Sequence, residues 1–176
     1  MSKDSIALIG FMGTGKTTVA KGLVKLLGSE YNLIETDELI IQEVGKSIPE
    51  IFEEEGEAKF REYEISVCDK VSKLNKVVIS CGGGIVLNPV NIDNLRRNCH
   101  IILLTASIEE IYKRIMKNGE KFRPLIKKEE PLEEIKKILA YRQPLYESSA
   151  DIIVDTSGKL ISKIVTMILF ELKKLD

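Results

Sequence analysis

The sequence predicts an α/β fold in which helices cover both faces of a parallel sheet. Stretches with helical periodicity alternate with short apolar runs, and strands that are joined through helices pair in parallel. At 176 residues the chain also has the length of one domain with a full core, so we expect a single domain over 1–176. The five expected strands are Ser5–Gly10, Asn32–Thr36, Lys76–Cys81, His100–Leu104 and Asp151–Asp155.

Helix-start signals support the segments between these strands. The segments Ser47–Glu50 and Ser107–Glu110 each have the residues of a capping box, in which a serine and a glutamate satisfy each other's backbone N–H groups. Asn88–Pro89 supplies an N-cap followed by proline at the first helical position. Apolar residues recur at helical spacing over about Lys159–Leu175, which predicts the final helix.

The segment Gly10–Thr17 matches the phosphate-binding pattern G-x-x-x-x-G-K-[ST] at every fixed position. It follows the first expected strand and opens a helical segment, so backbone N–H groups and the helix N-terminus can meet phosphate oxygens. Lys16 can then reach the β- and γ-phosphates, and the Thr17 hydroxyl can hold Mg²⁺. The alternative is a plain glycine-rich turn. The strand, the Lys-Thr pair and the helix together predict a nucleoside triphosphate site.

Composition excludes several other classes. The formal net charge of −1 gives no reason to expect nucleic acid or an anionic membrane as a partner. The sequence has neither an apolar run of membrane-spanning length nor a secretory signal at its N-terminus, so we expect a cytoplasmic protein. Its three cysteines lack metal-ligand spacing and are expected to be buried free thiols, and the single histidine, His100, is interpreted as structural.

One segment is strongly basic. Residues 113–128 contain seven basic side chains against one acid, Glu120, and Asn118-Gly119 and Pro124 break helical periodicity near the centre. Such a segment is either a solvated face or a mobile lid that closes over phosphates, and we favour a lid over about 117–131.

Two absences separate kinases from other nucleotide-binding classes. The chain has no N-K-x-D guanine signature, and its third strand ends at Ser80 without the acidic residue that motor ATPases usually carry. A small-molecule kinase remains. Asp37 follows the second strand at the carboxyl edge of the sheet, where it can orient or deprotonate an acceptor hydroxyl, or simply cap a helix. The glycines at 82–84 allow a ligand close approach, or form a tight turn.

Two arginines can bind an acidic acceptor. Arg61 is followed at i+3 by Glu64, which can fix its rotamer, and Arg142 stands two residues before Pro144, where we expect its helix to end. An arginine fork matches a carboxylate with two parallel hydrogen bonds. Spacing alone does not place both arginines in one pocket.

Taken together, these motifs resemble shikimate kinase. The resemblance covers nearly the whole chain and rests on GFMGTGKTT, ETD at 35–37, SIPEIFEEEGEAKFREYE at 47–64, CGGG at 81–84, FRPLI at 122–126 and YRQPLYE at 141–147. It implies a three-layer P-loop kinase fold, with a five-stranded parallel sheet of order 2-3-1-4-5 and a mobile lid. It also implies ATP-dependent phosphorylation of the 3-hydroxyl of shikimate, on the route to chorismate and the aromatic amino acids.

The resemblance further implies a role for individual residues. Lys16, Asp37 and Arg123 would be catalytic, Thr17 would hold Mg²⁺, and the helical segment of about 37–64 would bind the acceptor. The ATP-binding residues would be Gly13, Thr14, Gly15, Lys16, Thr17, Thr18, Arg123 and Lys159. The shikimate-binding residues would be Asp37, Arg61, Gly82, Gly83, Gly84 and Arg142. Phe52 and Phe60 either wall the acceptor or belong to the ordinary core.

The chain departs from the family pattern at Glu35, where the family commonly has aspartate near the Mg²⁺ water shell. Three other functions remain open: a gluconate kinase-like or other small-molecule P-loop kinase, a nucleoside monophosphate kinase, and a non-catalytic nucleotide-binding module. The contexts FRE at Arg61 and YRQPLY at Arg142 favour shikimate as the acceptor. We expect a monomer.

Overall fold

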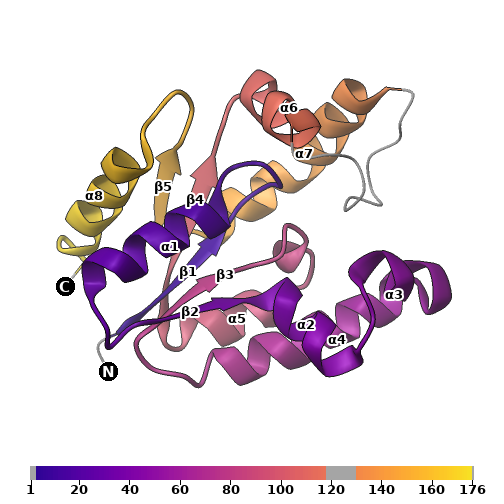
Figure 1. The fold of residues 1–176 in the computed structure, drawn as a ribbon, viewed down its shortest axis with the longest axis horizontal. Coiled ribbons are helices and arrows are strands. Elements are labelled where there is room, and N and C mark those ends of the chain that lie inside the picture. The colour runs from indigo at the N-terminus through magenta and orange to yellow at the C-terminus, as the bar shows by residue number, and fades with distance from the viewer. Residues whose placement is uncertain (1–2, 118–129, 176) are drawn as a thin grey trace.

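A computed structural model describes residues 3–117 and 130–175 of the chain. The expected mobile lid, about 117–131, lies almost entirely outside the described residues. Figure 1 shows five strands side by side at the centre, with helices on both faces of the sheet. The strands are β1 (Ser5–Ile9), β2 (Asn32–Glu35), β3 (Val77–Ser80), β4 (Cys99–Thr105) and β5 (Ile152–Asp155).

The sheet confirms the predicted topology. Its strand order is β2-β3-β1-β4-β5, and every neighbouring pair is parallel. Each strand end differs from the expected one by no more than one residue, because short apolar runs between polar residues mark their own limits. In the register of β2 and β3, Glu35 lies opposite Ser80, and Leu8 of β1 pairs with Ser80 from the other side. The carboxyl ends of these three strands therefore meet at one edge.

Helices surround the sheet on both faces. They are α1 (Lys16–Leu27), α2 (Thr36–Val44), α3 (Ile48–Glu54), α4 (Gly56–Val71), α5 (Pro89–Arg96), α6 (Ile108–Lys117), α7 (Pro131–Ser149) and α8 (Ile161–Leu172), together with the short 3₁₀ helix η1 (Ile85–Leu87). The capping box at Ser47 and the asparagine cap at Asn88 form as predicted, and Ser107 accepts a hydrogen bond from the Glu110 N–H.

Side chains of β1 alternate between two apolar clusters, one on each face of the sheet. Ile6 and Leu8 pack on the face that α1 and α8 cover, whereas Ala7 and Ile9 pack with the helices of the opposite face (Figure 1). This alternation is expected of a strand whose two faces are both buried. Among the described residues, no helix is both long and apolar enough to cross a membrane. The three cysteines are buried free thiols, as predicted.

The expected end of the helix near Pro144 is wrong. Helix α7 continues through Pro144 to Ser149, although a proline ring removes one helical hydrogen bond and disfavours the turn before it. Contacts on both sides of the proline hold the helix in place, because Arg142 and Tyr146 each donate a hydrogen bond to the Gly83 carbonyl. Tertiary contacts thus override the local stop signal.

Candidate active site

A cavity of about 570 Å³ opens at the carboxyl edge of the sheet. The phosphate loop lines one end of it, and residues of α2, α4 and α7, with the glycines after β3, line the other. We call these the nucleotide end and the acceptor end, after the ligands that the sequence predicts for them. Open α/β sheets bind their ligands at this edge. The cavity has a size typical of small-ligand sites.

The phosphate loop has the backbone conformation that its glycines permit. Gly13 and Gly15 have φ angles of 80° and 95°, in the left-handed region that other residues adopt only with strain. Gly15 serves as the N-cap of α1, so the helix N-terminus faces the cavity that Gly15 lines. The Lys16 ammonium donates hydrogen bonds to the carbonyls of Gly10 (2.8 Å) and Phe11 (3.0 Å). The lysine is thereby held across the loop, beside the position that phosphates would take.

Three side-chain oxygens gather beside the loop, those of Thr17, Glu35 and Ser80. The Thr17 hydroxyl donates to Glu35 Oε2 at 2.8 Å, and its oxygen lies 3.2 Å from the Ser80 hydroxyl. Mg²⁺ prefers such hard oxygen donors and is usually bound by few protein ligands together with phosphate oxygens. Within the described ranges, no group of three or more His, Cys, Asp or Glu could hold a metal ion by itself. The residues present therefore fit an ion that the nucleotide brings with it.

The acceptor end of the cavity is built from charged side chains. Arg61 donates from Nη1 to Glu64 Oε2 and from Nη2 to Glu57 Oε1, both at 2.9 Å, so the predicted i+3 pairing is present. The Glu64 side chain is only 1% exposed. Arg142, which is 5% exposed, enters from α7 and donates to the Gly83 carbonyl at 3.2 Å. The fold therefore brings both arginines into one pocket.

Four polar atoms in this pocket lack a hydrogen-bond partner in the described structure. Buried side-chain atoms without a partner number five among the described residues, and four of these belong to residues that line the cavity. They are Asp37 Oδ1, Arg61 Nε, Glu64 Oε1 and Arg142 Nε. A buried polar group without a partner costs about 1–3 kcal/mol, so a cluster of them indicates groups that a ligand satisfies.

Burial changes the acid–base properties of the two carboxyl groups. Desolvation raises the pKa of Asp37 above its usual value, although the positive charges of Lys16 and Arg61 oppose the shift. Desolvation likewise raises the pKa of Glu64 despite its ion pair with Arg61. A raised pKa makes a carboxylate a stronger proton acceptor, which suits a group placed to take a proton from a hydroxyl.

Two of the three glycines after β3 lie too close to neighbouring side chains to carry a Cβ. A Cβ on Gly82 would lie 2.5 Å from Asp37 Oδ1, and one on Gly84 would lie 2.1 Å from Arg61 Nη1. At Gly83 the nearest atom would be 3.6 Å away, an ordinary contact. The turn is fixed by a hydrogen bond from Gly82 N–H to the Thr36 hydroxyl at 2.9 Å. Two of the three glycines therefore make room for acceptor-site side chains.

The remaining predicted residues also line this cavity, with one exception. Phe52 and Phe60 lie side by side at the acceptor end, with ring centroids 4.9 Å apart. Lys159 lines the nucleotide end and pairs with Asp155 at 2.5 Å. Every predicted ATP- and acceptor-binding residue lines the cavity apart from Arg123, which lies outside the described residues.

The alternative interpretation of Asp37 as a helix cap is wrong. The N-cap is Glu35, two residues before Asp37, so Asp37 lies in the first turn of α2. Its carboxylate is directed toward Gly82 and Glu64 instead of toward the backbone of its own helix.

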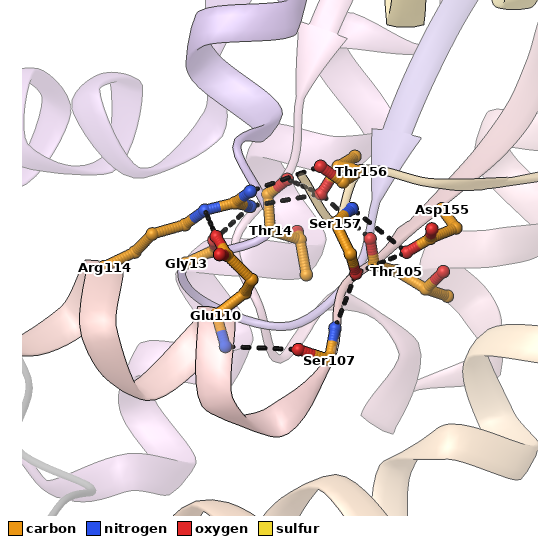
Figure 2. A network of polar contacts seen from close by, with 9 residues as sticks. All are labelled: Gly13, Thr14, Thr105, Ser107, Glu110, Arg114, Asp155, Thr156 and Ser157. Carbon is orange, nitrogen blue, oxygen red and sulfur yellow. Dashed lines mark hydrogen bonds and ion pairs between the residues drawn. The ribbon is translucent and has the colours of Figure 1, made fainter. Parts of the chain in front are cut away.

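Three residues that line or support the site were missed in the sequence. Arg114 of α6 and Thr156 after β5 line the nucleotide end, and Figure 2 shows their hydrogen bonds to the phosphate loop. Tyr146 is buried beneath the acceptor end, where its hydroxyl donates to the Gly83 carbonyl. Two local signals pointed to Arg114: it belongs to the basic segment 113–128, and Glu110, four residues before it, forms an i,i+4 ion pair with it at 3.2 Å.

Known proteins resemble this chain over most of its length. The model of the shikimate kinase family matches residues 12–173. A shikimate kinase of Caldanaerobacter subterraneus is 45% identical over 160 residues, which is 91% of each chain. The structure titled shikimate kinase from Acinetobacter baumannii in complex with shikimate is 31% identical, with a TM-score of 0.91 over 99% of this chain and 96% of that one.

A second kind of kinase shares only the fold. A gluconokinase from Sinorhizobium meliloti covers 98% of this chain and 93% of its own, with a TM-score of 0.64 and 19% identity. At that identity the likeness concerns architecture alone. The family match spans most of the sequence, and the alignment with the Caldanaerobacter relative covers most of this chain and most of the relative. The chain belongs to the shikimate kinase family.

Proposed function

We infer that the chain transfers the γ-phosphoryl group of ATP to the 3-hydroxyl of shikimate, giving shikimate 3-phosphate and ADP. The observation that carries this conclusion is the group of unpartnered buried atoms on Asp37, Arg61, Glu64 and Arg142. Two of these side chains are arginines and two are carboxyl groups. An acceptor that bears both a carboxylate and hydroxyl groups satisfies all four, whereas a simple polyol leaves the arginines without an anion.

We propose that the two arginines bind the acceptor carboxylate and that Asp37 binds its hydroxyls. Glu64 and Glu57 hold the Arg61 guanidinium, and the Gly83 carbonyl holds that of Arg142, so both forks are fixed before the acceptor arrives. Fixed donors bind with less loss of side-chain entropy than mobile ones. The faces of Phe52 and Phe60 form the apolar wall.

In the transfer step, the acceptor oxygen forms a bond to the γ-phosphorus while the bond from that phosphorus to the oxygen of ADP breaks. Asp37 takes the proton of the attacking hydroxyl, which its raised pKa favours. Lys16 leaves the loop carbonyls and neutralises charge on the β- and γ-phosphates. Lys159 flanks the adenine, and Arg123 contacts the transferring group.

We further propose that Thr17, with Glu35 and Ser80 behind it, holds the Mg²⁺ that accompanies ATP. When bound, this ion neutralises charge that develops on the phosphates. Glu35 is longer than aspartate by one methylene, and its carboxylate reaches the Thr17 hydroxyl directly at 2.8 Å. We also propose that the chain acts as a cytoplasmic monomer on small molecules.

A coupled ADP-release assay with shikimate, gluconate and AMP offered separately tests this function. Release of ADP that depends on shikimate, with little turnover of gluconate or AMP, is the expected result. Turnover of gluconate or AMP equal to that of shikimate would contradict it. Thr166→Val, on the outer face of α8, serves as a folded control with unchanged rates.

A further inference from the structure

A network of hydrogen bonds at the nucleotide end joins four separate parts of the chain. The Thr156 network consists of Gly13 and Thr14 in the phosphate loop, Thr105 at the end of β4, Arg114 on α6, and Thr156 after β5 (Figure 2). Thr156 is at its centre and is only 1% exposed. Its hydroxyl is therefore shielded from water and depends on protein partners.

The Thr156 hydroxyl can donate to either of two carbonyls. Its oxygen lies 3.1 Å from the Thr14 carbonyl oxygen and 2.9 Å from that of Thr105. A hydroxyl has one proton, so it serves one of them at a time. The Thr105 carbonyl already accepts the Thr156 backbone N–H at 2.8 Å. The carbonyl of Thr14, in the phosphate loop, therefore depends more on the hydroxyl proton than the Thr105 carbonyl does.

Arg114 holds the same hydroxyl from the other side. Its Nη1 lies 3.1 Å from the Thr156 hydroxyl oxygen and 3.2 Å from the Gly13 carbonyl, and its Nη2 donates to the Thr156 carbonyl at 3.2 Å. Because the guanidinium can only donate, it occupies a lone pair of the hydroxyl oxygen and leaves the proton to point elsewhere. Two consecutive carbonyls of the loop, Gly13 and Thr14, are thus held from outside it.

Holding a carbonyl also fixes the N–H of the same peptide. In a trans peptide the C=O and N–H bonds point in opposite directions, so a Thr14 carbonyl held toward Thr156 turns the Gly15 N–H to the opposite side. Gly15 is the N-cap of α1 and lines the cavity. N–H groups at a helix N-terminus are the donors that bind phosphate. Gly15 has a φ angle of 95°, and the peptides on either side of a glycine rotate easily unless a contact such as the one to Thr156 restrains them.

We propose that Thr156 is a positioning residue for nucleotide binding: its hydroxyl fixes the Thr14–Gly15 peptide so that the Gly15 N–H faces the phosphates. The proposal rests on the proposed function, because it assumes that the phosphate loop binds ATP and ADP. Thr156 acts through the loop and not on the acceptor, whose binding groups lie at the other end of the cavity.

The test compares MgADP and shikimate binding by isothermal titration of the full chain. Thr156→Val keeps the shape of the side chain and removes the hydroxyl, whereas Thr156→Ser keeps the hydroxyl. Thr156→Ala removes it without placing a methyl group against the carbonyls, so it replaces the valine variant if that variant does not fold. Thr166→Val is the matched control, because Thr166 also donates to a carbonyl, that of Ser162 at 2.9 Å, on the exposed face of α8.

Thr156→Val and Thr156→Ala are expected to weaken MgADP binding by about 5- to 30-fold, the effect of one or two kcal/mol. Shikimate binding should stay within about twofold of wild type, since a hydroxyl lost at the nucleotide end removes no acceptor contact. Thr156→Ser should restore MgADP binding, and Thr166→Val should leave both ligands unaffected. A merely structural role would instead weaken both ligands together or respond equally to serine and valine.

Unchanged MgADP binding in Thr156→Val, equal weakening of both ligands, or no recovery in Thr156→Ser would each overturn the proposal. Failure of the proposed function has a different signature, because wild type would then bind no shikimate. The MgADP comparison between wild type and the Thr156 variants would still decide the role of Thr156.

Discussion

The two ends of the cavity are built in different ways. The nucleotide end comes mainly from one contiguous segment, Gly10–Thr18, and its binding groups are chiefly backbone N–H groups with one lysine. The acceptor end is assembled from side chains of α2, α4 and α7, which are far apart in the sequence. The first depends on backbone conformation and the second on the convergence of buried charges.

This difference determines which end of the cavity holds buried charged groups without full hydrogen bonding. The acceptor end holds two carboxyl groups with raised pKa values and two arginines whose Nε atoms lack partners. The carbonyls of the phosphate loop, by contrast, are satisfied by Lys16, Arg114 and Thr156. The loop carbonyls at the nucleotide end are thus paired within the protein, whereas four buried atoms at the acceptor end are left for a ligand to pair.

The largest effect is expected at the one charged side chain of the phosphate loop. Lys16→Ala should lower kcat by about 1000-fold, because a donor aimed at charge that develops in the transition state is lost. The far-UV circular dichroism spectrum should stay that of wild type, since Lys16 lies at a cavity and not in either apolar cluster. Lys21→Ala, on the exposed face of the same helix, is the control. An unfolded Lys16→Ala variant would show that the lysine holds the loop together structurally.

The next effect separates the two ends by ligand. Arg61→Lys and Arg142→Lys should each weaken shikimate binding by about 1.5–3 kcal/mol, because lysine keeps the charge but cannot form the planar pair of hydrogen bonds. ATP affinity should change little in titrations of the same samples, and the exposed Arg97→Lys provides a control. An equal loss of ATP affinity would place that arginine in the nucleotide end.

A smaller and graded effect is expected along the glycine turn. Gly84→Ala forces the Arg61 guanidinium to move, and Gly82→Ala forces Asp37 to move, so each should raise the KM for shikimate about tenfold or more. Gly83→Ala should stay within about threefold of wild type, because its added Cβ meets nothing closer than 3.6 Å. Steady-state kinetics for the three variants give the order, and a Gly83 variant as impaired as the others would contradict it.

The smallest effect concerns stability and carries a sign. Asp37→Asn removes a buried carboxyl group. Its raised pKa means that the ionised carboxylate lowers the stability of the folded state. As pH rises above the ordinary value of 3.8, the unfolded chain loses this proton before the folded one does, so the wild type is progressively destabilised across that window. Asp37→Asn should therefore be more stable by about 1 kcal/mol near neutral pH, with the advantage shrinking toward about pH 4.

Urea unfolding of wild type and Asp37→Asn at several pH values measures this difference. Turnover by Asp37→Asn should be strongly reduced in the same preparations. Equal stability at every pH would mean that the Asp37 carboxylate is solvated well enough in the folded state to carry no penalty.

Features that depend on adjacent residues could be predicted from the sequence. The strand limits, the cap at Ser47 and the phosphate loop each lie within a short contiguous stretch, where periodicity and spacing contain the information. The pairing of Arg61 with Glu64 was predictable for the same reason, since residues three apart lie on one helix face.

Features that depend on convergence could not be predicted from spacing. Arg142 and Tyr146 stabilise α7 across Pro144 through a carbonyl some 60 residues earlier in the chain, as their hydrogen bonds to Gly83 show. The hydrogen bond from Thr156 to the Thr14 carbonyl of the phosphate loop likewise requires that the end of β5 lie beside the loop. That placement is a property of the strand order. The resemblance to shikimate kinase predicted that Arg61 and Arg142 share a pocket, whereas their spacing in the sequence did not.

Competition between two acidic polyols tests most directly that the acceptor end selects shikimate. Wild-type chain, MgATP and equal concentrations of shikimate and gluconate are incubated together, and phosphorus NMR follows the products. We expect one phosphate monoester, coupled to the ring proton at carbon 3 of shikimate, while gluconate remains unchanged. Phosphorylated gluconate as the main product, or a shikimate monoester at another oxygen, would contradict it.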